Sequence, residues 1–365
     1  WAWGFGLRFG LKELHNRLLR SSAMALSSSS QQSAALALLG AGLVLAWLSL
    51  RRQSRQAEAE AFPNGAGAVV RNTPATGTPA GRLRQLLAER QKIIVMPCCY
   101  DGLTARLIER MGFELTFMTG FGVSAVHGFA DCQLVSYQEM LDAAFRICGS
   151  LNRICCIADG DTGYGNAVNV KRTVRGYAQA GMAGVMIEDQ VAPKRCGHTK
   201  GTAVVPREEA LARIRAACDA RDEGPWDICI MARTDARASL GLDEAIARCQ
   251  AFVQAGADIT FLEAPRSEEE MRRYCSEVPG YKMVNMLPSG KTPFLPHARL
   301  QEIGFAIAAY PLTLLSAGLK AQQAALEELR SSGAVNPSKE LDFDTLKDIV
   351  GFNTYYSEEE RYRTA

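Results

Sequence analysis

Short apolar runs alternate with segments of helical periodicity from Gly81 onward. Each run is nearly continuous in Val, Ile, Met, Phe, Cys and Ala, as expected of strands buried on both faces of a parallel sheet. Amphipathic stretches such as Val170–Gln179, Arg207–Asp222 and Leu242–Gln254 fall between the runs. The pattern predicts eight strands, at Ile93–Pro97, Leu115–Thr119, Ile154–Ala158, Gly184–Glu188, Ile228–Ala232, Ile259–Glu263, Met283–Met286 and Phe305–Ala309.

Four of the expected helices end in a glycine just before the next strand, which is the residue favoured past a helix C-terminus: Gly112, Gly181, Gly256 and Gly304. Eight strand–helix units in about 250 residues match the size of a (β/α)8 barrel. We therefore expect an α/β chain with a TIM barrel over residues 81–335 and a C-terminal extension over 336–365. An open doubly wound sheet is the alternative, but no Gly-rich phosphate loop follows the first strand.

Residues 1–80 differ in composition from the rest, with eight basic and three acidic residues. Within them Ala34–Leu50 is an almost unbroken apolar run followed by two arginines, at the short limit for a membrane span. We expect a non-globular targeting segment that ends in a disordered linker, with a chloroplast or mitochondrial transit peptide favoured by its Ser- and Arg-rich flanks. A retained membrane anchor at residues 34–50, a secretory signal and a cytoplasmic protein are the alternatives.

Charge and cysteine content narrow the function classes. The 41 basic and 39 acidic residues leave a net charge of +2, so nothing in the balance predicts nucleic-acid binding. The eleven cysteines lie between Cys98 and Cys275 and form no CxxC pair. We interpret most of them as small buried side chains in a reducing compartment.

Polar side chains follow the expected strands at their C-terminal ends, where barrel enzymes place their chemistry. Asp159 and Asp161 follow the third strand, Glu188 ends the fourth, Arg233 follows the fifth and Glu263 ends the sixth. Burying so many charges is costly unless they bind something. Because close carboxylates repel, their oxygens predict a Mg²⁺ or Mn²⁺ site. A tight Gly/Asp loop without a ligand is the alternative for DGDTGYG.

A basic segment, Lys194-Arg195-Cys196-Gly197-His198, follows the fourth strand. A thiol flanked by Lys, Arg and His should have a lowered pKa, which suits a general acid or base. A basic surface loop with an incidental cysteine is the alternative. Arg233 is interpreted as a fork for a substrate carboxylate or, more simply, as the partner of a neighbouring acid.

Residues 81–329 resemble the isocitrate lyase/phosphoenolpyruvate mutase superfamily. The resemblance rests on KRCGH, DGDTGYGN, IEDQ, ARTDA, FLEAP and NMLPSGKTP, which occur in the family's order. Within the superfamily the chain is most similar to the branch of the petal death protein and carboxyvinyl-carboxyphosphonate phosphorylmutase, and next to methylisocitrate lyase. Thr119 stands where the family usually has serine, and Thr199 departs from the residues that follow the histidine in isocitrate lyases.

The resemblance implies a barrel whose last helix is swapped between subunits of a homotetramer. It implies Mg²⁺ held by Asp159 and Asp161, largely through waters, with Asp131 and Glu188 nearby. Cys196 is the implied acid that protonates the departing carbanion. Other implied catalytic residues are Glu188, Lys194, His198 and Arg233, and the implied substrate pocket comprises Thr119, Gly120, Phe121, Gly197, Arg233, Glu263 and Asn285.

The expected function is a Mg²⁺-dependent carbon–carbon lyase that acts on small 2-hydroxy di- or tricarboxylates of the 2-alkylmalate or methylisocitrate type. Hydrolysis of oxaloacetate to oxalate and acetate is the close alternative, since both reactions would use the same site. A phosphonate-forming phosphorylmutase is a third hypothesis, although Cys196 argues against it. An inactive membrane-tethered scaffold is the hypothesis from a different class, and it predicts broken site residues that the sequence does not show.

Overall fold

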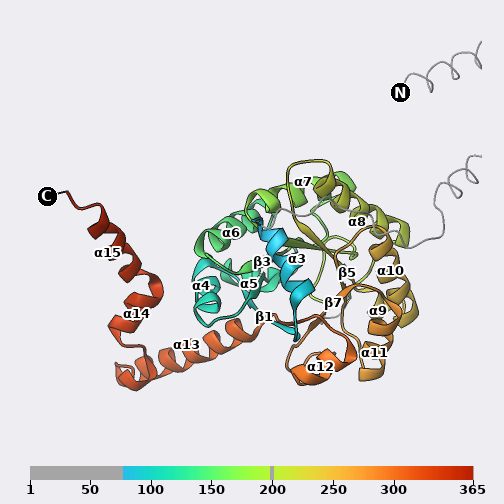
Figure 1. Ribbon diagram of the computed structural model, residues 1–365. Coiled ribbons are helices and arrows are strands. Elements are labelled where there is room, and N and C mark those ends of the chain that lie inside the picture. Colours follow the sequence, from blue (N-terminus) through green and yellow to red (C-terminus); the bar gives the residue numbers. More distant parts are fainter. Residues whose placement is uncertain (1–76, 198–200, 365) are drawn as a thin grey trace, which may run out of the picture. The chain divides into compact units, whose positions relative to one another are not determined.

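The computed structural model describes residues 77–197 and 201–364. Eight parallel strands close into a barrel in chain order, and helices surround it (Figure 1). The (β/α)8 prediction is confirmed, and the predicted strands all overlap the observed ones with ends displaced by no more than two residues. The strands are β1 (Ile94–Cys99), β2 (Leu115–Met118), β3 (Cys155–Asp159), β4 (Gly184–Glu188), β5 (Cys229–Thr234), β6 (Ile259–Leu262), β7 (Tyr281–Asn285) and β8 (Ile307–Tyr310).

Both faces of the sheet are buried, which explains the continuous apolar runs. In β3, Cys155 and Ile157 belong to the barrel interior, whereas Cys156 and Ala158 pack in the layer between sheet and helices. That outer layer is covered by α4 (Gly102–Arg110), α5 (Gly120–Val126), α6 (Tyr137–Ser150), α7 (Ala167–Gln179), α8 (Arg207–Asp222), α9 (Ala236–Ser239), α10 (Leu242–Gln254), α11 (Glu268–Glu277) and α12 (His297–Ile303).

The four glycines predicted as helix ends all have positive φ, the left-handed backbone conformation that commonly follows the last turn of a helix. At Gly304, which ends α12, φ is 114°. All eleven cysteines are free thiols, and seven of them are buried. The predictions of glycine-terminated helices and of mostly buried cysteines are therefore confirmed.

Helix α3 (Pro79–Glu89) closes the N-terminal end of the barrel, because Leu83 and Leu87 pack with the interior residues of the strands. Thr78 caps it by accepting a hydrogen bond from Gly81 N at 2.9 Å. The helix therefore starts two residues before the boundary expected at Gly81, and Pro79 and Ala80 belong to the barrel rather than to the linker. The apolar run at 34–50 lies outside the described residues; no helix within them is long and apolar enough to cross a membrane.

A buried carboxylate outside the site holds the turn that precedes β3. Glu109, at 6% exposure, accepts hydrogen bonds from the backbone N–H groups of Asn152, Arg153 and Ile154 at 2.6–3.2 Å. Burial alone would raise the pKa of Glu109, but these N–H groups stabilise its charged form and lower the pKa below its usual value. Glu109 is therefore a structural anion on the side of α4.

The C-terminal region forms α13 (Thr313–Ser332), a short 3₁₀ turn at Pro337–Lys339, α14 (Phe343–Val350) and α15 (Phe352–Arg361). None of these elements contains a buried residue, although large apolar side chains lie along them. Two contacts tie α14 to α4: Arg110 pairs with Asp348 at 2.5 Å, and Arg106 donates to the carbonyl of Val350 at 2.6 Å. These helices therefore expose apolar surface that the described residues leave uncovered.

Candidate active site

A cavity of about 60 Å³ lies at the C-terminal ends of the strands. Residues from all eight strands and from the 194–197 segment line it, so the barrel brings together most of the residues predicted for the site. The predicted residues in its wall are Thr119, Phe121, Asp131, Asp159, Lys194, Cys196, Gly197, Arg233, Glu263 and Asn285. Gly120, Asp161 and Glu188 lie directly behind this wall, as their contacts show below, and His198 lies outside the described residues.

The loop after β3 presents two carboxylates toward the cavity. Asp159 accepts from the backbone N–H groups of Gly120 and Asp161, each at 3.1 Å. A side chain at position 120 would place its Cβ 2.7 Å from Asp159 Oδ2, so only glycine allows this approach. Asp161 itself has φ 48°, a conformation that non-glycine residues rarely adopt. The loop therefore holds both aspartates in a strained, fixed arrangement.

Lys194 carries its ammonium group into this acidic region. Its Nζ lies 2.5 Å from Asp131 Oδ1 and 2.9 Å from Asp161 Oδ1, and its side chain is 5% exposed. Burial alone would lower the pKa of Lys194, but Asp161, Asp159, Glu188 and Asp131 outweigh burial and raise it well above its usual value. Burial raises the pKa of Asp161 to about 6, even though Lys194 opposes the shift. The ammonium thus balances carboxylates from two separate loops.

The carboxyl groups meet the chemical requirements of a magnesium site. Glu188 Oε1 is buried and has no hydrogen-bond partner among residues 77–197 and 201–364, and burial raises the pKa of Glu188 well above its usual range. A hard cation relieves both conditions, because oxygen is its preferred ligand. Within the same ranges no three acidic, His or Cys side chains are grouped to hold an ion directly. The donor set therefore fits an ion that keeps several waters, as Mg²⁺ does.

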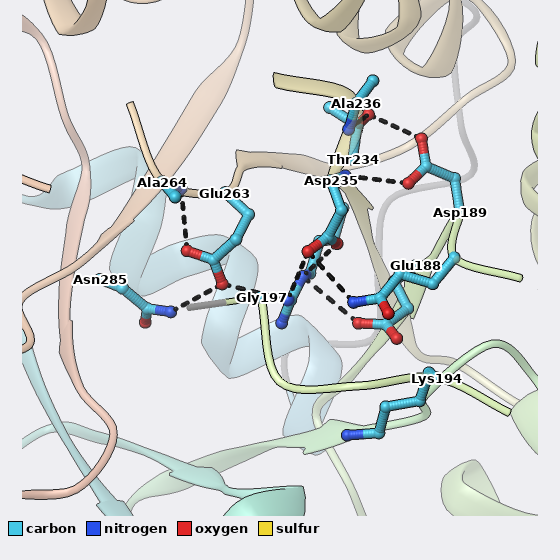
Figure 2. A network of polar contacts seen from close by, with 12 residues as sticks. Glu188, Asp189, Lys194, Gly197, Thr234, Asp235, Ala236, Glu263, Ala264 and Asn285 are labelled. Carbon is cyan, nitrogen blue, oxygen red and sulfur yellow. Dashed lines mark hydrogen bonds and ion pairs between the residues drawn. The ribbon is translucent and has the colours of Figure 1, made fainter. Parts of the chain in front are cut away.

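Arg233 pairs with three carboxylates that Figure 2 labels, those of Glu188, Asp235 and Glu263. Asp235 binds it through two hydrogen bonds, to Nε at 2.8 Å and to Nη2 at 2.9 Å. Glu188 Oε2 lies 3.3 Å from Nε, and Glu263 Oε2 lies 3.1 Å from Nη2. Burial alone would lower the pKa of Arg233, but these carboxylates raise it well above its usual value. Arg233 therefore pairs with neighbouring acids along its Nε–Nη2 edge, which was the simpler of the two alternatives predicted for it. These contacts do not involve Nη1.

Two further residues fix the far side of this cluster. Asn285 Nδ2 donates to Glu263 Oε2 at 3.3 Å, and Ala264 N donates to Glu263 Oε1 at 2.9 Å. Both oxygens of Glu263 are therefore engaged (Figure 2). The predicted residues Arg233, Glu263 and Asn285 form one hydrogen-bonded group.

The segment that carries Cys196 packs directly onto this group. A Cβ at Gly197 would lie 2.6 Å from Glu263 Cγ and 2.7 Å from both Arg233 Nη2 and Asp235 Oδ1. Cys196 is half-buried and lines the cavity. The structure therefore brings the thiol of the basic segment and the acidic strand ends to the same cavity.

Sequence reasoning missed several residues of the site. Asp235 was not assigned to the site, although its position two residues after Arg233 could have indicated an ion pair. Gln190 and Gln133 contact the backbone of the 194–197 segment, and Lys291 donates to Gly197 O at 3.1 Å. No spacing in the sequence predicts these contacts, because each depends on the path of a loop.

The fold and the site together define a (β/α)8-barrel protein of the enzyme class. Carboxylates, buried cations and a thiol meet at one cavity at the C-terminal ends of its strands, an arrangement that suits small anionic substrates. The family model described as phosphoenolpyruvate phosphomutase matches residues 83–330. The chain belongs to the phosphoenolpyruvate mutase/isocitrate lyase superfamily, which confirms the resemblance found in the sequence.

The chain matches three relatives over most of their length. The chain is 42% identical to 2,3-dimethylmalate lyase of Eubacterium barkeri, over 78% of this chain and 98% of the relative. It is 39% identical to the chloroplastic carboxyvinyl-carboxyphosphonate phosphorylmutase of Arabidopsis thaliana, over 76% and 83%. It is 38% identical to 2-methylisocitrate lyase of Aeropyrum pernix, over 75% and 87%.

Solved structures add two comparisons. Oxaloacetate acetylhydrolase in complex with 3,3-difluorooxalacetate matches with a TM-score of 0.74 at 35% identity, over 78% of this chain and 96% of that one. Phosphonopyruvate hydrolase in complex with oxalate and Mg²⁺ matches with a TM-score of 0.69 at 28% identity, over 78% and 99%. The superfamily thus includes carbon–carbon lyases and an oxaloacetate hydrolase, and at least one member binds Mg²⁺.

Proposed function

We propose that this protein is a Mg²⁺-dependent carbon–carbon lyase that cleaves a 2-hydroxy dicarboxylate of the 2-alkylmalate type. The observation that carries the proposal is the shared cavity of Cys196, Arg233 and the acidic loop at Asp159. The 42% identity to a 2,3-dimethylmalate lyase supports the reaction class.

The cavity wall favours a substrate with an alkyl group. Beside the polar residues, the wall contains apolar side chains from the barrel interior and the mouth: Phe117, Met186, Phe261, Met283, Leu287 and Leu312. An apolar wall gains free energy when an alkyl group displaces water, whereas a third carboxylate against it would have to be desolvated without a partner. We therefore rank a 2-alkylmalate above a tricarboxylate such as methylisocitrate.

The proposed roles follow from the contacts. When bound near Asp159 and Asp161, Mg²⁺ would act as a Lewis acid on the oxygens of the substrate. Arg233 would bind a carboxylate through Nη1 and stabilise the negative charge that develops as the carbon–carbon bond breaks. Glu188, a buried carboxylate paired with Arg233, would accept the substrate's hydroxyl proton. Cys196 would then donate its proton to the carbanion carbon of the departing product.

The test is a product assay on the full chain with Mg²⁺ and a panel of oxaloacetate, 2,3-dimethylmalate, methylisocitrate, isocitrate and phosphonopyruvate, followed by NMR. We expect pyruvate from the alkylmalate, and its loss with EDTA and in Cys196→Ser. No turnover of any compound, together with no Mg²⁺ binding by calorimetry, would overturn the enzyme proposal and favour an inactive scaffold.

Hydrolysis of oxaloacetate is the second candidate. It is favoured by the match to oxaloacetate acetylhydrolase, which has a TM-score of 0.74 at 35% identity. In that reaction an attacking water would take the place of the substrate hydroxyl in donating its proton to Glu188. Oxalate plus acetate from oxaloacetate, with no cleavage of the alkylmalate, would assign this activity instead.

We also propose that the C-terminal helices pack against a second copy of the chain, as expected of a swapped helix in a homotetramer. The support is the exposed apolar surface of α13 to α15, including Leu326 at 65% and Phe343 at 72% exposure. Light scattering of the full chain tests the assembly, with a variant that ends at residue 312 as comparison. A monomeric full chain would contradict it.

For residues 1–80 we propose organelle targeting, supported by the chloroplastic relative. Imaging a fluorescent protein fused to these residues tests the proposal. Fluorescence in the cytoplasm or at a membrane without import would contradict it.

A further inference from the structure

The segment from Lys194 to Gly197 is held by side chains from three other parts of the barrel mouth. Gln133 Oε1 accepts from Lys194 N at 3.1 Å, and Lys291 Nζ donates to Gly197 O at 3.1 Å. The third residue that holds the segment is Gln190, which lies shortly before Lys194 in the sequence. Cys196 lies between these attachment points, so they determine where its thiol is placed.

Gln190 uses both ends of its amide group. Its Oε1 accepts from Arg195 N at 2.9 Å, while its Nε2 donates to Arg195 O at 2.8 Å. The same Nε2 donates to Asp235 Oδ1 at 3.1 Å. The side chain is 1% exposed, so water does not compete for these bonds. One buried amide therefore joins the residue next to Cys196 to the carboxylate that holds Arg233.

The two ends of the loop that carries Cys196 are held together without the side chain of Gln190. They are joined by backbone hydrogen bonds, from Val191 N to Ala203 O at 2.8 Å and from Val205 N to Asp189 O at 2.9 Å. Arg213 of α8 adds a bond to the backbone carbonyl of Gln190 at 2.8 Å. Loss of the Gln190 side chain would leave these attachments in place and loosen only the Cys196 segment, which Gln133 and Lys291 would still hold at its ends.

We propose that Gln190 is a positioning residue that couples the place of Cys196 to the orientation of Arg233. The inference rests on the proposed function, because it assigns Cys196 and Arg233 the roles given above. Gln190 itself does not line the cavity. Its amide holds the thiol segment against the cluster on which Gly197 packs, and it holds Asp235 in the orientation that binds Arg233.

Two substitutions separate the contacts. Gln190→Met keeps the length of the side chain and removes all three hydrogen bonds. Gln190→Glu keeps one acceptor, removes both donated bonds and places a carboxylate against Asp235. Gln250→Met is the matched control, because Gln250 also donates to a backbone carbonyl, that of Glu277 at 2.9 Å, on the exposed side of α10.

The first measurement needs no substrate or metal. The full chain is alkylated with iodoacetamide, and the rate at each cysteine is followed by peptide mass spectrometry. We expect Cys196 to react on the order of tenfold faster in both Gln190 variants, because the two buried hydrogen bonds to Arg195 are lost altogether in Gln190→Met and in part in Gln190→Glu. Cys132, which is exposed, should react at an unchanged rate, and Gln250→Met should match the wild type.

The second measurement is the split between kcat and KM on the substrate that the panel identifies. A misplaced acid lowers kcat on the order of 10²-fold, while KM should change less than about threefold. If Cys196 reacts at the wild-type rate in folded variants, the positioning role is overturned. It is also overturned if both variants fail to fold, as judged by circular dichroism, or if kcat is unchanged. A wild type without turnover refutes the proposed function alone, since the alkylation rates are read independently.

Discussion

Replacing Gly197 by alanine tests whether the Cys196 segment must lie where the structure places it. The new Cβ would meet three atoms at 2.6–2.7 Å, those of Glu263, Arg233 and Asp235. Ordinary contacts between such atoms are about 3.5–4.0 Å, so something must move by about 1 Å. The neighbours resist, because Asp235 and Glu263 are both ion-paired with Arg233.

The segment is therefore the part that moves. Overpacking of this kind costs about 1–3 kcal/mol. If that cost falls on the catalytic arrangement, kcat/KM drops about 5- to 150-fold, since each 1.36 kcal/mol is a factor of ten. The free energy of unfolding should change by less than about 0.5 kcal/mol, because the barrel core is not touched.

The assay compares kcat/KM and urea unfolding for the wild type, Gly197→Ala and Gly149→Ala. Gly149 is the control because nothing lies within 4 Å of its added Cβ and it sits inside α6. Activity of Gly197→Ala within twofold of the control would refute the close packing. A loss of 1–3 kcal/mol in stability with normal activity, in the range expected for overpacking, would show that the cluster, not the segment, absorbs the strain.

Three further predictions address stability and the metal. Glu109→Gln should lower the free energy of unfolding by about 1–3 kcal/mol at pH 7. Because the folded pKa of Glu109 is lowered, this difference is complete above its unfolded pKa and should vanish in urea titrations as pH falls through the folded value; a pH-independent difference would contradict it. Arg248→Met removes the ion-pair partner of the buried Asp189, which lies 3.0 Å away, and should cost about 3–5 kcal/mol by the same method, against little change for a surface arginine. Asp161→Asn should weaken Mg²⁺ binding in calorimetry at least tenfold, and unchanged affinity would exclude that residue from the site.

The barrel was predictable because its signal is repeated eight times. A strand buried on both faces needs a continuous apolar run, and each run is followed by a polar residue that the closed sheet carries to one end. The positions of Asp159, Glu188, Arg233 and Glu263 follow from that rule alone. Their meeting at one cavity is a consequence of closure and needs no information about loops.

The remaining contacts depend on loop conformations that no period encodes. Asp161 adopts φ 48°, and its ion pair with Lys194 links loops that are 33 positions apart in the chain. Gln190 reaches Asp235 across 45 positions. The Lys194 contact with Asp131 arises in the same way, from two loops that the barrel places side by side. Hydrophobic patterning is silent on such pairs, because each residue is polar and each loop is irregular.

The state of Arg233 explains why an acid-rich mouth suits an anionic substrate. Asp235 occupies the Nε–Nη2 edge of the guanidinium, and Glu188 and Glu263 add their charges to the same edge. The arginine is thereby held rigid, but its charge is largely offset before any substrate arrives. An incoming dicarboxylate would face net repulsion at this end of the barrel unless further positive charge is present. A divalent cation held near Asp159 and Asp161 would supply that charge, so the proposed reaction would require the metal for binding as well as for bond cleavage.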